Sequence, residues 1–288
     1  MTPGEAKPAP LLEAEALALF AGGRWLCADL ALRLHAGECL AVLGPNGSGK
    51  TTLLHTLAGL RDPGAGLIRL QGRGYRERSP RATARLRALL PQIQPEQFSC
   101  SVIESVLVGR HPHVGRWAWE SRADIEIAQA ALARVGIDHL AHRDVLSLSG
   151  GERQRAAIAA LLAQQPALYL LDEPLNHLDL RFQIQTLELF RALARDGAGV
   201  VMVLHDINLT ARFADQAILL DGHGGVLAGL AREVLQPGRL ADAFGHPLIR
   251  AEVDGHAVFA PRFGCWPSSW SWWSACRPCW EARIHERR

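Results

Sequence analysis

The sequence predicts an α/β fold with a parallel sheet that is covered by helices on both faces, and two patterns carry this prediction. From Ser149 to Pro237, apolar runs of strand length alternate with helical segments, and buried strands are expected at 167–171, 200–204 and 217–220. Strands that alternate with helices are typical of parallel sheets, because each crossover helix covers a face of the sheet. The second pattern is a glycine-rich loop between an apolar strand, 39–43, and an amphipathic helix.

This loop reads Gly-Pro-Asn-Gly-Ser-Gly-Lys-Thr and fits the pattern G-x-x-x-x-G-K-[ST]. Backbone N–H groups at the helix N-terminus are unpaired and attract anions, so the loop predicts a site for nucleotide phosphates. A glycine-rich turn without a ligand is the alternative. The residues predicted to bind nucleotide here are Gly44, Pro45, Asn46, Gly47, Ser48, Gly49, Lys50, Thr51 and Thr52.

Lysine is rare in this chain, which has Lys7 and Lys50 against 29 arginines. Because arginine supplies nearly all the other positive charge, a lysine in the loop indicates a specific requirement. Lys50 is expected to reach the β- and γ-phosphates, and the Thr51 hydroxyl is expected to ligate Mg²⁺.

A pair of acids, Asp172 and Glu173, ends the apolar run 168–171. Ligands bind at the carboxyl ends of the strands in such sheets, so both acids are expected beside the phosphates. Asp172 is predicted to hold Mg²⁺, directly or through water. Glu173 is predicted to polarise the attacking water. The alternative is that the two acids cap the next element.

The segment 148–155 reads Leu-Ser-Gly-Gly-Glu-Arg-Gln-Arg, and we call it the signature segment. Ser149 and Glu152 predict a capping box at the start of a helix. The two glycines between them each cost about 1 kcal/mol of helix stability, so capping alone does not account for them. They suit a close approach of an anionic ligand to exposed N–H groups.

The signature segment resembles that of the ATP-binding-cassette (ABC) ATPases, and three other segments stand in the order of that family. Gln92 in Leu-Pro-Gln is similar to the glutamine loop, Asp179 in Asn-His-Leu-Asp to the D-loop, and His205 in Val-Leu-His-Asp to the switch histidine. The resemblance covers about residues 11–250. It implies a P-loop NTPase (RecA-like) fold with a parallel-sheet core, an antiparallel β subdomain and a helical signature subdomain.

The resemblance also implies that two such chains pair head to tail with each ATP between them, so at least a homodimer is expected. Glu173, His205 and Gln92 would be catalytic, and Thr51, Gln92 and Asp172 would hold Mg²⁺. An aromatic ring that precedes the phosphate loop usually stacks on adenine, and Phe20 is the first candidate and Trp25 the second. The nucleotide-binding residues implied outside the loop are Phe20, Ser149, Gly150, Gly151 and Asp179.

Three parts are expected along the chain. Residues 1–10, with three prolines, form a flexible tail; residues 11–260 form the ABC ATPase domain, with a helical subdomain at about 90–150; residues 261–288 form a Trp- and Cys-rich extension. Short strands and turns are expected at 11–42, mostly helix at 81–145, and a late hairpin after Asp221-Gly222. Cys276 and Cys279 have the spacing of zinc ligands, although an extension that lies against a membrane or a partner is the favoured interpretation.

Composition and charge narrow the class of function. The net charge is +2, which leaves no electrostatic footprint for nucleic acid. No stretch approaches the roughly 18 apolar residues of a membrane span, and the N-terminus lacks a secretory signal. We therefore expect a cytoplasmic protein. For a transporter, the family resemblance implies a peripheral subunit at the cytoplasmic face of the inner membrane, with permease subunits on separate chains.

The segment 109–113 reads Gly-Arg-His-Pro-His and lies in the part of the chain that usually faces the permease in this family. Its sequence resembles the corresponding segment in cassettes of importers of ferric siderophores, haem and cobalamin. Residues 203–209 resemble the same group. The expected function is ATP-driven uptake of such a chelate, served indirectly by a periplasmic binding protein, and Trp117 and Trp119 favour cobalamin. His111 and His113 are expected to be contact residues rather than metal ligands. The alternatives are an importer of another nutrient such as zinc, or a soluble ABC ATPase that works in DNA repair or on ribosomes.

Overall fold

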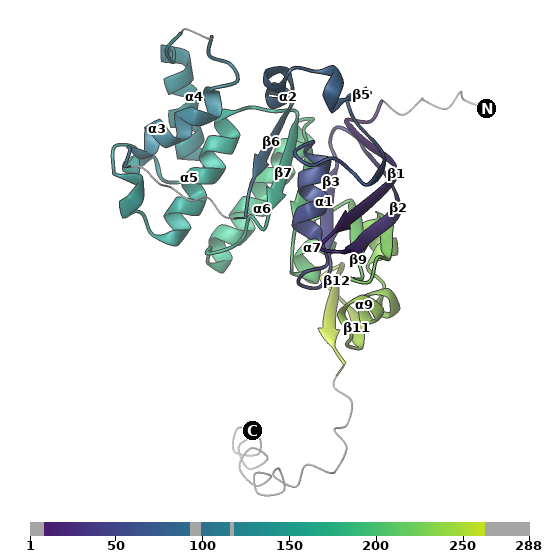
Figure 1. Cartoon of the computed structure of the whole chain (residues 1–288). Helices are drawn as coiled ribbons and strands as arrows, with labels where there is room; N and C mark the ends of the chain where they lie inside the picture. Colours follow the sequence, from purple (N-terminus) through teal and green to yellow (C-terminus); the bar gives the residue numbers. More distant parts are fainter. Residues whose placement is uncertain (1–8, 93–98, 116–117, 263–288) are drawn as a thin grey trace, which may run out of the picture.

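The centre of the molecule is a six-stranded sheet in the order β10-β9-β3-β8-β7-β6. The computed structural model describes residues 9–92, 99–115 and 118–262 (Figure 1). The five strands from β9 to β6 pair in parallel and β10 is antiparallel to β9, which confirms the predicted parallel-sheet core and the late hairpin. The strands are β3 (Cys39–Leu43), β6 (Arg87–Leu90), β7 (Leu168–Asp172), β8 (Gly199–Val203), β9 (Gln216–Leu220) and β10 (Val226–Leu230).

Both faces of this sheet are covered, as the apolar strands require. Every residue of β3, β7 and β8 is buried, and alternate side chains enter two different hydrophobic clusters. One cluster includes α5 (Gly150–Ala163) and α6 (Leu180–Arg195), and the other includes α1 (Lys50–Leu57). The short helix α7 (Ile207–Phe213) packs with the first cluster.

A second, antiparallel sheet covers α1 from the other side. It has the order β2-β1-β4-β5, and its strands are β1 (Leu12–Ala21), β2 (Arg24–Leu34), β4 (Ala65–Leu70) and β5 (Arg73–Gly74). The sequence predicted short strands here, and that was wrong for β1 and β2, which have 10 and 11 residues. Register shifts along β1 mark bulges, so the apolar alternation is interrupted and the strands look shorter than they are.

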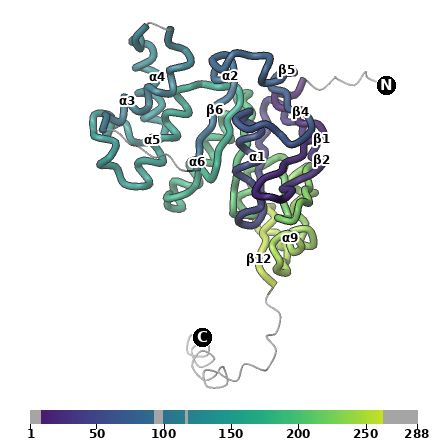
Figure 2. Tube along the Cα trace, viewed as in Figure 1, coloured from purple at the N-terminus to yellow at the C-terminus, as the bar shows by residue number. Residues whose placement is uncertain are grey.

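Helices gather at the end of the molecule opposite this second sheet (Figures 1 and 2). They are α3 (Val102–Leu107), the 3₁₀ turn η2 (Val108–Arg110), α4 (Arg122–Arg134) and α5. The helix α2 (Pro80–Leu86) lies between them and β5, at the start of β6 (Figure 1). The prediction of mostly helix at 81–145 missed β6, which follows α2 directly and joins the edge of the parallel sheet. Four residues that begin with an arginine carry no distinct strand pattern, so only the pairing with β7 reveals this strand.

The remaining described elements follow β10. They are α8 (Ala231–Val234), α9 (Pro237–Phe244) and a hairpin of β11 (Leu248–Val253) and β12 (His256–Pro261), together with the short 3₁₀ turns at 75–77, 138–140 and 145–147. None of the helices in the described ranges has the length and apolarity that a bilayer span requires. No cluster of three metal-ligating side chains occurs in the described part of the chain. The zinc and tail interpretations at Cys276 and Cys279 lie outside the described residues.

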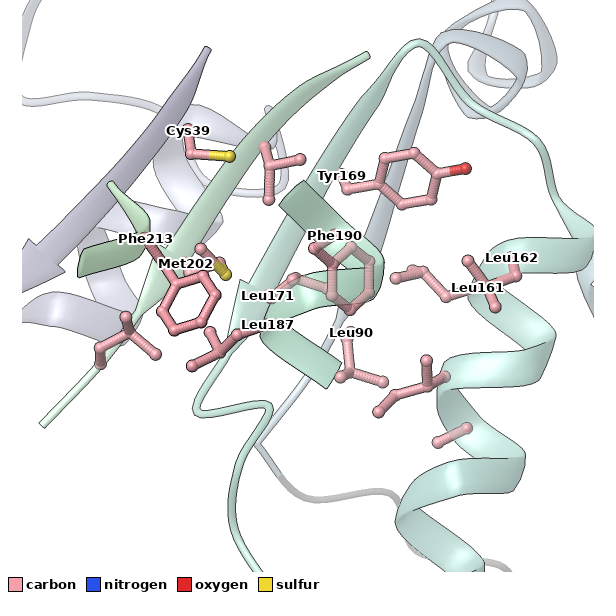
Figure 3. Close-up of a cluster of buried hydrophobic side chains, with 14 of the residues drawn as sticks. Cys39, Leu90, Leu161, Leu162, Tyr169, Leu171, Leu187, Phe190, Met202 and Phe213 are labelled. Carbon is pink, nitrogen blue, oxygen red and sulfur yellow. The ribbon is translucent and has the colours of Figure 1, made fainter. Parts of the chain in front are cut away.

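Phe190 is the largest fully buried side chain of the cluster between α6 and the sheet. It lies among Leu90, Leu171 and Leu187 and meets the ring of Tyr169 edge to face at 5.7 Å (Figure 3).

We expect Phe190→Ala to lower the free energy of unfolding by about 3–5 kcal/mol, because it opens a cavity that the surrounding strands cannot fill. Denaturant unfolding measures this. Trp119→Ala is the control, since that side chain is 90% exposed, and its change should stay within about 0.5 kcal/mol. Equal effects of the two substitutions would contradict this description of the core.

Candidate functional site

Four segments meet at one edge of the parallel sheet. The loop 44–49 follows β3, and His205 follows β8. Asp172 ends β7 with Glu173 directly after it, and Gln92 follows β6. These strands are neighbours in the order β3-β8-β7-β6 and run in parallel, so their carboxyl ends lie together. An open cavity of about 790 Å³ results there. It is lined by Ala21, Gly22, Arg24, Leu26, Asn46, Gly47, Gly49, Lys50, Thr51, Thr52, Gln92, Glu173 and His205.

The phosphate loop needs glycine at two positions for steric reasons. A Cβ on Gly44 (φ +148°) would lie 2.5 Å from the carbonyl oxygen of Leu220, and one on Gly49 (φ +104°) would lie 2.7 Å from Cδ1 of Leu26. Lys50 opens α1 and is 5% exposed. Its Nζ donates to the carbonyl oxygens of Gly44 and Pro45, at 2.9 and 3.0 Å, so the loop wraps around the amine.

Charge in this site is partly withdrawn from water. Burial lowers the pKa of Lys50, and the negative charges of Glu173 and Asp172 oppose that shift. Burial raises the pKa of Asp172, while the Thr51 hydroxyl and the charge of Lys50 act against the rise. The charge of Glu173 raises the pKa of Asp172 further, so Lys50 offsets only part of the negative charge of the two acids.

Asp172 is the side chain that suits a metal ion. It is fully buried at the end of β7, and neither carboxylate oxygen makes a well-formed hydrogen bond to any described residue. Buried oxygens without partners are costly, and a small divalent cation that prefers oxygen ligands removes that cost. The donor set of Asp172 and the neighbouring Thr51 hydroxyl therefore fits Mg²⁺.

Glu173 lies beside Asp172 and is held by three side chains. Its Oε2 accepts from Gln92 Nε2 at 2.9 Å and from Asn176 Nδ2 at 2.7 Å, and its Oε1 lies 2.7 Å from His205 Nε2. Burial acts to raise the pKa of Glu173, but the hydrogen bonds from Asn176, His205 and Gln92 outweigh it and lower the pKa. Its backbone has φ +50°, a strained value for a residue with a side chain. An ionised, oriented carboxylate at the cavity wall can accept a proton from water.

The signature segment does not line this cavity. Ser149 and Glu152 form the predicted capping box at the start of α5, and Ser149 and Gly150 are exposed. A Cβ on Gly151 would lie 3.1 Å from the carbonyl oxygen of His177, so packing on the segment 176–179 also calls for a small residue here.

The segment 176–179 lies beside the signature segment on the same surface. Gln154 Nε2 donates to the carbonyl oxygen of Pro174 at 3.0 Å, which joins α5 to the chain that follows β7. Asp179 is exposed and caps α6 by accepting from the N–H of Phe182 at 3.0 Å. One chain therefore carries the cavity at the sheet edge and, separately, an exposed surface with Ser149, Gly150 and Asp179.

The aromatic candidates for adenine lie near the cavity but not on its wall. Phe20 and Trp25 form an edge-to-face pair with ring centroids 5.3 Å apart, and both are about half exposed. The turn between them, with Ala21, Gly22 and Arg24, is what lines the cavity.

Sequence reasoning missed Arg24. Its guanidinium donates to the carbonyl oxygens of Gly47 and, at 2.9 Å, Gly222, so it ties the β1–β2 hairpin to the phosphate loop. One arginine among 29 gives no sequence signal for this role. Asn176 was also missed as a partner of Glu173, although it stands in the quoted Asn-His-Leu-Asp segment.

A phosphate loop at the edge of a parallel sheet, with a lysine, two acids and a histidine around one cavity, defines a P-loop nucleotide hydrolase. Comparison with known proteins gives the family. The profile of the family described as ABC transporter matches residues 27–176, and the chain belongs to that family. It binds and hydrolyses ATP.

Curated relatives match nearly the whole chain. The hemin import ATP-binding protein HmuV of Gloeobacter violaceus is 41% identical over 262 residues, 88% of this chain and 92% of that protein. HmuV of Pseudomonas aeruginosa is 41% identical over 260 residues, 88% of this chain and all of that protein.

Solved structures agree with the fold. A metal-chelate-type ABC transporter in an inward-facing conformation has a TM-score of 0.77 and 32% identity, covering 88% of this chain and 98% of that one. A dimeric ATP-binding cassette in a post-hydrolysis state, bound to ADP and phosphate, has a TM-score of 0.66 and 25% identity, covering 77% of this chain and 99% of that one. The predicted P-loop NTPase fold is confirmed.

We expect Arg24→Ala to raise the Kd for ATP about five-fold, because the phosphate loop loses hydrogen bonds worth about 1 kcal/mol in an exposed setting. Equilibrium binding of a fluorescent ATP analogue measures this. Arg33→Ala is the matched control on the same strand, since Arg33 pairs with Glu13 away from the cavity. An unchanged Kd for Arg24→Ala would show that the hairpin does not hold the loop.

Proposed function

We propose that this chain is the ATP-hydrolysing subunit of an importer of haem or a closely related metal chelate. The observation that carries the proposal is the match to hemin import proteins at about 40% identity through more than four fifths of the chain. Trp117 and Trp119 favoured cobalamin in the sequence, but Trp117 lies outside the described residues and the names of the relatives favour haem. The three-part division of the chain at residues 10 and 260 belongs to this proposal.

The cavity would hold the phosphates of ATP. Lys50 and the N–H groups of the loop orient the β- and γ-phosphates, and the Phe20 ring, or Trp25 beside it, packs against adenine. Asp172, Thr51 and Gln92 would hold Mg²⁺, which when bound neutralises phosphate charge.

Hydrolysis in this proposal depends on Glu173. Its lowered pKa keeps the carboxylate ionised at neutral pH, so it can orient a water molecule and accept a proton from it as the water oxygen attacks the γ-phosphorus. ADP leaves with the electrons of the broken bond. Gln92, Asn176 and His205 hold the carboxylate in place. In this proposal His205 would also contact the γ-phosphate.

Two copies would pair head to tail. The exposed signature segment and Asp179 of one copy then cover the cavity of the other, which gives each ATP a second wall. The dimeric cassette with ADP and phosphate supports this arrangement. Outside the dimer, we propose separate permease subunits, a periplasmic binding protein that acts through them, a peripheral position at the cytoplasmic face of the membrane, and no nucleic acid partner.

We expect Glu173→Gln to bind ATP with a Kd within about three-fold of the wild type while kcat falls about 10²–10⁴-fold, because the amide cannot accept the proton. Phosphate release and nucleotide binding are the measurements. Glu188→Gln, an exposed glutamate on α6, is the control and should keep full activity. Near-normal turnover of Glu173→Gln would show that Glu173 is not the group that accepts the proton from the attacking water.

The import proposal is tested by isolating the tagged protein from detergent-solubilised native membranes and reconstituting what comes with it. We expect a polytopic permease in stoichiometric amount, and haem uptake into vesicles that is lost with Lys50→Ala. Uptake of cobalamin, a ferric siderophore or zinc instead would correct the substrate. A protein that comes alone, or with ribosomes or DNA, would contradict the importer.

A further inference from the structure

The segment 109–113 was expected to offer contact residues to a permease, but three of its five residues, Gly109, Arg110 and His113, contact the interior of this chain. Arg110 is 7% exposed, and His113 Nε2 lies 2.9 Å from the carbonyl oxygen of Gln164 at the end of α5. A Cβ on Gly109 would lie 2.1 Å from the carbonyl oxygen of Ala160, so η2 can lie against α5 only with glycine there. His111 is exposed, but most of this motif serves the interior.

Arg110 joins the ends of two helices. Its Nε donates to Oδ1 of Asp124, in the first turn of α4, at 2.8 Å. Its Nη1 donates to the carbonyl oxygen of Ala163, the last residue of α5, at 2.8 Å, and to Oε1 of Gln165 at 3.1 Å. A helix N-terminus favours an acid and a helix C-terminus favours a cation, so one guanidinium satisfies both ends. Hydrogen bonding from the Ser121 hydroxyl, and then from Arg110, lowers the pKa of Asp124 to about 2, which keeps the pair charged.

The same place is tied to the core by α2. Arg81 and Arg85 each donate from Nε to the carbonyl oxygen of Pro112, at 2.9 and 2.8 Å. Gln164 Nε2 donates to the carbonyl oxygen of Arg87, the first residue of β6, at 2.9 Å. The segment 109–113 therefore connects α4 and α5 to α2 through hydrogen bonds, and α2 leads directly into β6.

Two elements that the proposed dimer brings to ATP extend from this point. The strand β6 leads to Gln92, and α5 begins, at its far end, with the signature segment. A 14-residue helix is about 21 Å long, so a tilt of about 10° at its C-terminal end moves its N-terminal end by about 4 Å. A hydrogen bond does not survive such a displacement.

We propose that Arg110 is a positioning residue: it holds the C-terminal end of α5 to α4 and to the segment 109–113, which α2 ties to the core, so that Ser149 of one copy reaches the ATP of the other. This inference rests on the head-to-tail dimer proposed above. Lysine cannot replace Arg110, because a single ammonium group does not reproduce the guanidinium fork that serves Asp124, Ala163 and Gln165 together.

The test uses the full chain with Glu173→Gln, in which ATP should accumulate a dimer. Arg110→Met is added to this parent, and Arg122→Met is the matched control, since Arg122 begins the same α4 but its side chain is 93% exposed. Light scattering gives the ATP concentration at half-dimerisation. Binding of a fluorescent ATP analogue to dilute, monomeric protein gives the Kd of the single cavity.

We expect Arg110→Met to raise the half-dimerisation concentration at least ten-fold while the monomer Kd stays within two-fold, and Arg122→Met to change neither. Arg110→Lys keeps the positive charge and serves as the test variant if Arg110→Met fails to fold. It should raise the half-dimerisation concentration at least three-fold. An unchanged half-dimerisation point, or a monomer Kd that rises in parallel, contradicts the positioning role. A parent that never dimerises with ATP overturns the head-to-tail dimer itself, and with it this inference.

Discussion

The parallel pairing of β3, β8, β7 and β6 is the constraint on which the nucleotide site depends. Each strand ends at the same edge of the sheet, and each end delivers one component: the phosphate loop, His205, the acid pair and Gln92. Because β3, β7 and β8 are buried at every residue, a shift in register would expose apolar side chains or bury polar ones. The geometry of the site is therefore fixed by the hydrophobic core.

The site itself is a balance of charges that the fold has partly removed from water. Lys50 and Asp172 are buried, and Glu173 is strained and held by three hydrogen bonds. The buried Asp172 oxygens have no well-formed hydrogen bond among the described residues, and this donor set suits a small divalent cation. The signature segment lies outside this cavity, and its Ser149 and Gly150 are exposed.

The parts of the fold and of the site that depend on neighbouring residues in the chain could be predicted from the sequence. The phosphate loop, the strand that ends in Asp172, the hairpin after β9 and the capping box of Ser149 and Glu152 all depend on residues within one or two turns of chain. What could not be predicted depends on contacts between distant segments. β6 is visible only through its pairing with β7, and Arg24 only through its contact with Gly47.

Gly109-Arg110 and Gly151 show a further limit of pattern reasoning. The first motif indicated an outward contact, and the structure gives it an inward one, on α4 and α5. Gly151 was explained by an anionic ligand, and the structure adds the close carbonyl oxygen of His177. A pattern can identify residues that a fold requires while leaving open which neighbour requires them.

The central claim is that each ATP is enclosed by two copies of this chain. The most direct measurement is the structure of the Glu173→Gln protein crystallised with ATP and Mg²⁺. We expect two chains related by a twofold axis, with the γ-phosphate held by the Lys50 loop of one and within hydrogen-bond distance of Ser149 of the other. A structure in which ATP is enclosed by one chain, with Ser149 of every copy in solvent, would contradict the account.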